Sequence, residues 1–103
     1  MNADIIFLHG GFSKKLLDTL RPFPDLKQMF NGKIIAGDSA GANVLCEVFY
    51  SKMAEEVLFG FGILPVKIIC HYEEKYKDVL KDIKPELETW RLPEYHYRVL
   101  YTD

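Results

Sequence analysis

The sequence predicts an α/β fold in which a parallel sheet is flanked by helices. Short runs rich in β-branched residues at 5–8, 33–36 and 66–70 alternate with segments of helical periodicity. These runs do not alternate strictly between apolar and polar residues, which is typical of strands buried on both faces of a parallel sheet. Because strands and helices follow one another in turn, we expect the order β-α-β-α-β-α-β.

The first half of the chain is expected to contain two strands and two helices. The first strand, at 5–8, is followed by leucines that share one helical face between residues 13 and 20. The sequence Arg-Pro-Phe-Pro at 21–24 ends that helix, because proline cannot continue it. A short second helix is predicted at 25–30, before the strand at 33–36.

The second half is expected to add two helices and two strands. Apolar residues between 40 and 49 keep helical spacing. No element is predicted for residues 51–62, and a compact strand is predicted at 66–70. An amphipathic helix follows, and a last strand is predicted at 97–101. The apolar face of that helix consists of Tyr76, Val79, Leu80 and Ile83.

Composition limits the classes of function. The 103 residues suit a single domain spanning residues 1–103, and 49% of them are hydrophobic, as a packed core requires. The net charge of -2 argues against nucleic acid or an anionic membrane as a partner. No apolar run approaches the ~20 residues of a membrane span. Cys46 and Cys70 are expected to be buried free thiols in a reducing, cytoplasmic environment.

Three sequence features follow predicted strands. Gly10 and Gly11 come after the first strand, Ser39 after the second and His71 after the third. The carboxyl ends of parallel strands meet at one edge of the sheet, where α/β proteins place their sites. The sequence therefore predicts that these residues gather at one place.

Ser39 lies in the pattern Gly37-x-Ser39-x-Gly41, between a predicted strand and a predicted helix. This arrangement is typical of a nucleophile elbow, in which glycines relieve crowding at a strained turn. Backbone N–H groups at the helix start, at Ala40, could stabilise an oxyanion. The alternative is a glycine-rich turn that packs closely or binds phosphate, although no P-loop lysine follows it.

A general base must lie within hydrogen-bonding distance of the Ser39 hydroxyl. His71 is the first candidate because it ends a predicted strand, as a histidine with only a structural role can also do. His9 and His96 are the other histidines. His96 lies in an aromatic segment and is expected to have a packing or surface role.

The segments FLHGGFSKKLLDTLR, GKIIAGDSAGANVL and FGFGILPVKIICHY resemble the dipeptidase E and cyanophycinase family of serine peptidases, from about residue 5 to 72. The resemblance implies a nucleophile at Ser39, a base at His71 and oxyanion donors in the backbones of Gly11 and Ala40, with Gly10 beside them. It also implies the flavodoxin-like fold of class I glutamine amidotransferases, a small peptide substrate, and no cofactor or metal. Those amidotransferases use cysteine at the elbow, so Ser39 argues against amidotransfer.

The acid that would orient His71 is not fixed by spacing. We expect it between Ser39 and His71, with Glu55 or Glu56 as first choices and Glu47 next. Asp38 is expected to point away from the base.

The chain also departs from the family. Phe12 and Ser13 follow the glycine pair where the family has asparagine and threonine. Family members carry strands and helices before that pair, so we expect a fold truncated at its N-terminus, with exposed sheet surface that a second copy could cover. Two hypotheses follow: a serine exopeptidase, or a catalytically inactive remnant that serves as a binding or dimerisation module.

Overall fold

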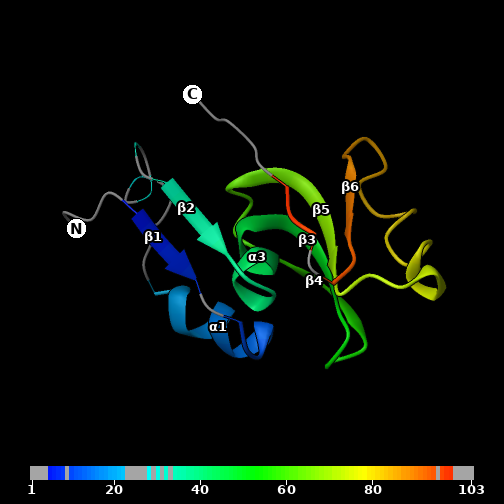
Figure 1. Cartoon of the computed structure of the whole chain (residues 1–103), viewed down its shortest axis with the longest axis horizontal. Coiled ribbons are helices and arrows are strands. Elements are labelled where there is room, and N and C mark those ends of the chain that lie inside the picture. The colour runs from blue at the N-terminus through cyan, green and yellow to red at the C-terminus, as the bar shows by residue number, and fades with distance from the viewer. Residues whose placement is uncertain are drawn as a thin grey trace.

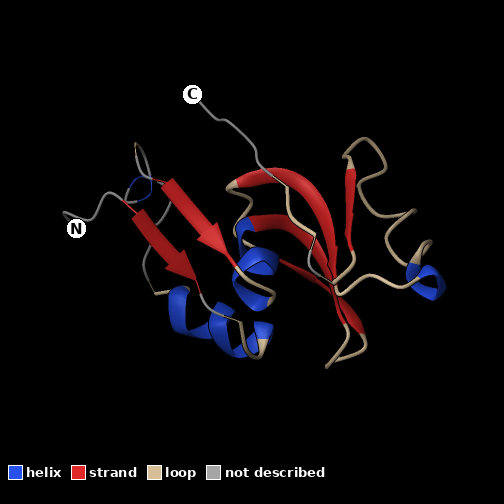
Figure 2. Ribbon diagram, in the orientation of Figure 1, coloured by secondary structure: helices blue, strands red, loops and turns tan. Residues whose placement is uncertain are grey.

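The computed structural model describes residues 5–8, 10–22, 28, 30, 32, 34–94 and 96–98. It confirms a mixed α/β fold with parallel strands and flanking helices (Figure 1, Figure 2). The helix predicted at 25–30 lies mostly outside the described residues. In chain order the elements are β1 (Ile5–Leu8), α1 (Ser13–Leu20), β2 (Ile34–Gly37), α3 (Ala40–Leu45), β3 (Cys46–Ser51), β4 (Glu56–Phe59), β5 (Leu64–Cys70), the 3-10 helix η1 (Glu74–Tyr76) and β6 (Thr89–Leu92).

The strands among the described residues form two sheets rather than one. β1 and β2 pair in parallel, from Ile5 opposite Ile34 to Leu8 opposite Gly37. The second sheet has the order β4-β3-β5-β6, and only β4 runs antiparallel to its neighbour. Figure 1 shows α3 between the two sheets and α1 beside it. The polypeptide between β2 and β3 therefore links both sheets, and this is where the predicted elbow lies.

β5 forms the centre of the larger core. Val66, Ile68, Ile69 and Cys70 are all buried on it. Ile68 faces a cluster that contains Leu17 of α1 and Val44 of α3. Successive side chains of a strand point to opposite faces, so Ile69 faces a second cluster. Burial on both faces explains why the sequence of β5 is apolar without strict alternation.

The helix predicted across residues 40–49 is shorter than expected. It ends at Leu45, and the chain continues directly into β3. The backbone of 46–51 pairs with β4 on one side and β5 on the other, which a helix would prevent. The end of α3 is held by backbone bonds from Phe61 N to Val44 O and from Gly62 N to Cys46 O, of 2.8 and 3.2 Å. A partner distant in sequence thus replaces the next helical turn.

The prediction of an amphipathic helix through residues 76–83 is wrong. Only the 3-10 turn Glu74–Tyr76 forms, followed by turns, although Leu80 is buried as expected. The ammonium of Lys67, whose residue is 2% exposed, donates to the carbonyls of Leu80 and Ile83 at 2.7 and 2.9 Å. These bonds satisfy carbonyls that a helix would have paired internally.

The last strand also differs from expectation. β6 occupies Thr89–Leu92 and pairs in parallel with β5, in a segment for which the sequence predicts no strand. Tyr97 and Arg98 are not in a strand, and the rest of the predicted strand at 97–101 lies outside the described residues.

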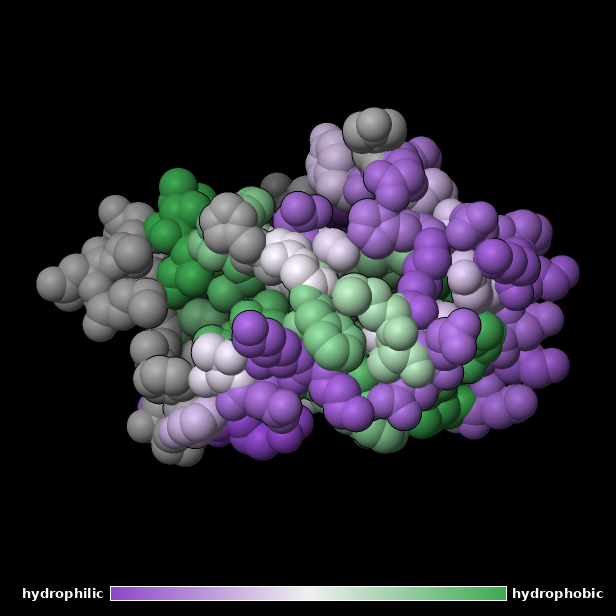
Figure 3. Space-filling model, turned by 90° about the horizontal axis from the view of Figure 1, so that it is seen from below, coloured by the Kyte–Doolittle hydropathy of each residue, from purple (hydrophilic) through white to green (hydrophobic). Residues whose placement is uncertain are grey.

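An apolar surface lies over the smaller sheet (Figure 3). Ile5 and Ile34 are directly opposite each other in the register and are 62% and 66% exposed. A second copy of the chain covering this surface stays a prediction.

Gly60 provides a test of the packing around α3. A Cβ added there would lie 2.2 Å from the carbonyl oxygen of Cys46, so we expect Gly60→Ala to lower the free energy of unfolding by about 2 kcal/mol in urea titrations. Gly32→Ala is the control, because its added Cβ meets nothing within 4 Å and only its φ of 73° is unfavourable. The control should cost about 1 kcal/mol. Equal losses at both positions would contradict the close packing at Gly60.

Candidate active site

Ser39 lies at the turn between β2 and α3 in a strained backbone conformation. Its φ and ψ are 53° and -107°, in a region that residues with a Cβ rarely adopt. Backbone bonds from Gly41 N to Asp38 O and from Asn43 N to Ser39 O, of 3.0 and 2.9 Å, fix the turn. A residue held in such a sparsely populated region costs about 1–3 kcal/mol, so the surrounding contacts must maintain this conformation.

The two glycines of the motif have a steric role. A Cβ at Gly37 would lie 2.7 Å from Ala42 N, and a Cβ at Gly41 would lie 2.1 Å from Leu8 O. Both distances are too short for a real Cβ, so the start of α3 packs directly on the backbones of β1 and β2. The Gly-x-Ser-x-Gly pattern therefore reflects close packing on both sides of Ser39.

His71 follows the last residue of β5 and contacts Ser39. Its Nε2 lies 3.0 Å from Ser39 Oγ, and its side chain is 44% exposed. Its φ of 51° turns the chain out of the strand. The preceding residue, Cys70, brings its Sγ to 3.6 Å from the Ser39 carbonyl oxygen. The ends of β2 and β5 thus meet, and an imidazole and a hydroxyl are placed at hydrogen-bonding distance.

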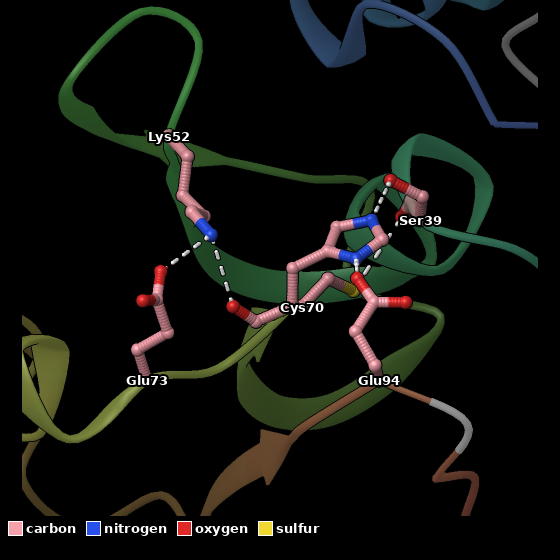
Figure 4. A network of polar contacts seen from close by, with 6 residues as sticks. Ser39, Lys52, Cys70, Glu73 and Glu94 are labelled. Atoms are coloured by element: carbon pink, nitrogen blue, oxygen red, sulfur yellow. Dashed lines mark hydrogen bonds and ion pairs between the residues drawn. The ribbon is translucent and has the colours of Figure 1, made fainter.

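Glu94 completes this set from the end of β6 (Figure 4). Its Oε1 contacts His71 Nδ1. The parallel register places Leu92 opposite Cys70, and Tyr72 N donates to Leu92 O at 3.0 Å. A carboxylate at Nδ1 favours the tautomer that carries its proton there, which leaves Nε2 free to accept the Ser39 proton.

The glutamates expected to orient His71 lie elsewhere. Glu56 forms an ion pair with Lys14 at 3.4 Å. Glu55 occupies the turn between β3 and β4 with a φ of 53°, and Glu47 pairs with Lys84. In the described part of the chain the carboxylate that contacts His71 is Glu94, which corrects the choice of Glu55 or Glu56. Polar residues that follow parallel strands meet at one edge of the sheet. Glu94 follows from the same reasoning once Thr89–Leu92 is recognised as a strand.

The other predicted site residues surround Ser39. A Cβ at Gly10 would lie 3.4 Å from Ser39 Cβ, and one at Gly11 would meet nothing within 4 Å. Gly11, Ser39 and His71 line a pocket of about 60 Å³. Gly10, Gly11 and Ala40 also line an open groove of about 440 Å³, together with Phe12 and Leu16 of the first loop and helix.

Of the two remaining histidines, the structure describes His96. His9 lies outside the described residues. His96 is exposed, and its backbone N–H donates to the Pro93 carbonyl at 3.1 Å. Among the described residues no cluster of histidine, cysteine and carboxylate side chains could hold a metal ion. No helix in the same part of the chain is long and apolar enough to cross a membrane.

The two cysteines are buried free thiols, as predicted. Burial raises the pKa of both Cys46 and Cys70 to about 12. Cys70 adds a smaller increase at Cys46, and Asp38 adds a smaller increase at Cys70. Because the thiolate is the nucleophilic form, neither thiol is suited to catalysis.

This burial predicts the reactivity of the thiols. At pH 8 a thiol of pKa about 12 is only about one part in ten thousand thiolate, so the native protein should react with Ellman's reagent far more slowly than the unfolded protein. In denaturant both of the 2 cysteines should react rapidly. Rapid reaction of either thiol in native protein would contradict the described burial.

Comparison with known proteins identifies a family for the chain. The family model described as Peptidase family S51 matches residues 1–91, a range that contains Ser39 and His71 but not Glu94. No curated protein and no solved structure matches the chain. Since the match covers most of the sequence, the chain belongs to peptidase family S51.

Proposed function

We propose that the protein is a serine-type exopeptidase that cleaves short peptides through Ser39. The observation that carries this proposal is the chain of contacts from Ser39 Oγ to His71 Nε2, at 3.0 Å, and from His71 Nδ1 to Glu94. The same nucleophile, base and orienting acid define serine hydrolases on unrelated folds. Membership of a peptidase family supports a peptide bond as the target.

In the proposed reaction, Ser39 Oγ attacks the carbonyl carbon of the scissile bond while His71 Nε2 accepts the hydroxyl proton. The tetrahedral intermediate collapses, the C–N bond breaks, and His71 gives its proton to the leaving amine. Water then attacks the acyl-enzyme with His71 as base. The acyl C–O bond breaks, the proton returns to Ser39 Oγ, and a free carboxylic acid leaves. Glu94 stabilises the imidazolium formed in both half-reactions.

The negative charge on the intermediate needs donors beside Ser39. We assign this role to the backbone N–H groups of Gly11 and Ala40. Ala40 is the first residue of α3, and the first N–H groups of a helix lack partners within the helix. Gly11 faces open space within the same pocket as Ser39. Such preorganised donors are worth about 3 kcal/mol each in acyl transfer.

The surroundings of Ser39 favour small substrates. The pocket that contains His71 has a volume of only about 60 Å³, and the groove that shares Gly11 with it has a volume of about 440 Å³. An exopeptidase needs room for only a few residues of its substrate. The buried free thiols support a reducing, cytoplasmic location.

A serine-reactive fluorophosphonate provides the direct test. We expect the wild-type protein to be labelled on Ser39, because His71 activates the hydroxyl. Mass spectrometry of the labelled peptide locates the modification, and Ser39→Ala is the control. If folded wild-type protein is not labelled, the alternative of a catalytically inactive binding or dimerisation module is favoured instead.

The assignment of the acid is tested by two glutamine substitutions. Glu94→Gln should lower kcat/KM for a short peptide by about 10²–10⁴-fold, because an amide cannot stabilise the imidazolium and can stabilise the wrong tautomer. Glu56→Gln, which removes only the exposed pair with Lys14, should change kcat/KM less than twofold and stability by well under 1 kcal/mol. The opposite ranking would refute Glu94 as the orienting acid.

A further inference from the structure

We infer that Lys52 is a positioning residue that holds the backbone of His71, so that its imidazole stays between Ser39 and Glu94. This inference rests on the proposed function of the site. Lys52 follows β3 in the turn to β4, and its Nζ donates to the His71 carbonyl oxygen at 3.0 Å. Figure 4 shows Lys52 beside Glu73, on the opposite side of the view from Ser39 and Glu94.

The bond from Lys52 acts on a peptide group that is held at both ends. The peptide between His71 and Tyr72 donates its N–H to Leu92 O at 3.0 Å, while its carbonyl accepts from Lys52. These two bonds fix the plane of that peptide and therefore the ψ angle of His71. Its φ, at 51°, lies in a region that residues with a Cβ avoid. Without Lys52, one of the two bonds that hold this conformation is lost.

Lys52 is itself held in place. Its Nζ lies 3.2 Å from Glu73 Oε2 and 5.2 Å from the centre of the Tyr76 ring. That ring stacks against Tyr50 of β3, with centroids 5.4 Å apart. The carboxylate and the aromatic face both favour a positive charge at this point. The ammonium is therefore directed at the His71 carbonyl rather than free in solvent.

The position of the bond explains why it should matter for catalysis. Lys52 contacts the main chain of the base and not its ring, so it alters neither the nucleophile nor the acid directly. A small rotation about the His71 backbone would move Nε2 away from Ser39 Oγ, and misplacement by about 1 Å can cost about a hundredfold in rate. Lys52 thus acts through the placement of the imidazole.

The test compares two lysines that share one neighbour. Lys52→Met keeps most of the aliphatic stem and removes the ammonium. Lys75→Met is the matched control, because Lys75 Nζ also lies 5.2 Å from the Tyr76 ring. The two lysines differ in that Lys52 is the one whose ammonium donates to the His71 carbonyl oxygen. Urea unfolding of both variants checks that they fold.

The first readout is the rate at which a fluorophosphonate labels Ser39. We expect Lys52→Met to slow labelling by about tenfold or more, and Lys75→Met to leave it within about twofold. Equal labelling of Lys52→Met and wild-type protein would overturn the inference while leaving the proposed function intact. If Lys52→Met does not fold, Glu73→Gln replaces it. A slowing of about threefold is then expected, because Glu73→Gln leaves the ammonium less firmly held, and no slowing overturns the inference.

The second readout does not depend on activity. A proton on His71 Nδ1 that is bonded to the Glu94 carboxylate should give a downfield proton NMR signal in wild-type protein and in Lys75→Met. We expect the signal to be broadened or lost in Lys52→Met. If wild-type protein is not labelled, the proposed function fails. A signal that is present in wild-type protein and Lys75→Met but broadened or lost in Lys52→Met would still support Lys52 as the residue that positions His71. An unchanged signal in Lys52→Met, or no signal in wild-type protein, would overturn it.

Discussion

The strained backbone conformation of Ser39, with its positive φ, is the constraint on which the rest of the site depends. It exists because α3 starts directly against the backbones of β1 and β2, where Gly37 and Gly41 leave no room for a Cβ. A turn with ordinary dihedral angles would carry the helix away from β1 and would open this packing. The energy of the close packing maintains the strain, and the strain presents the hydroxyl of Ser39 at the end of the sheet.

The strain at Ser39 is matched by strain at the residue that it contacts. His71 also has a positive φ, so each partner of the 3.0 Å contact is held by its surroundings rather than by its own preference. β5 provides a firm support for His71, because most of its side chains are buried in two hydrophobic clusters. Lys52 and Leu92 then fix the peptide that follows His71. Preorganisation of this kind is what a general base requires.

A buried lysine of β5 holds the segment that leads to Glu94. Lys67 of β5 binds two carbonyls in the connection between β5 and β6, so that this segment lies on the sheet without forming a helix. A buried ammonium is costly unless its donors are paired, and here the connection supplies the partners. After this connection β6 pairs with β5, with Leu92 opposite Cys70. That register brings Glu94 to His71.

The sequence by itself determined the α/β class, the first two strands with the helix between them, β5, the buried cysteines and the approach of Ser39 to His71. These features follow from local patterns: a run of buried residues, a glycine motif, or a polar residue directly after a strand. Tertiary structure decided the secondary structure of residues 46–51 and 76–83. Their apolar spacing also fits a helix, but the first segment forms a strand and the second mostly turns. Periodicity tells which side chains are buried, but the partner of each backbone hydrogen bond comes from a distant segment. β3 exists because β4 and β5 flank it, and Glu94 reaches His71 because β6 pairs with β5, neither of which spacing along the chain can specify.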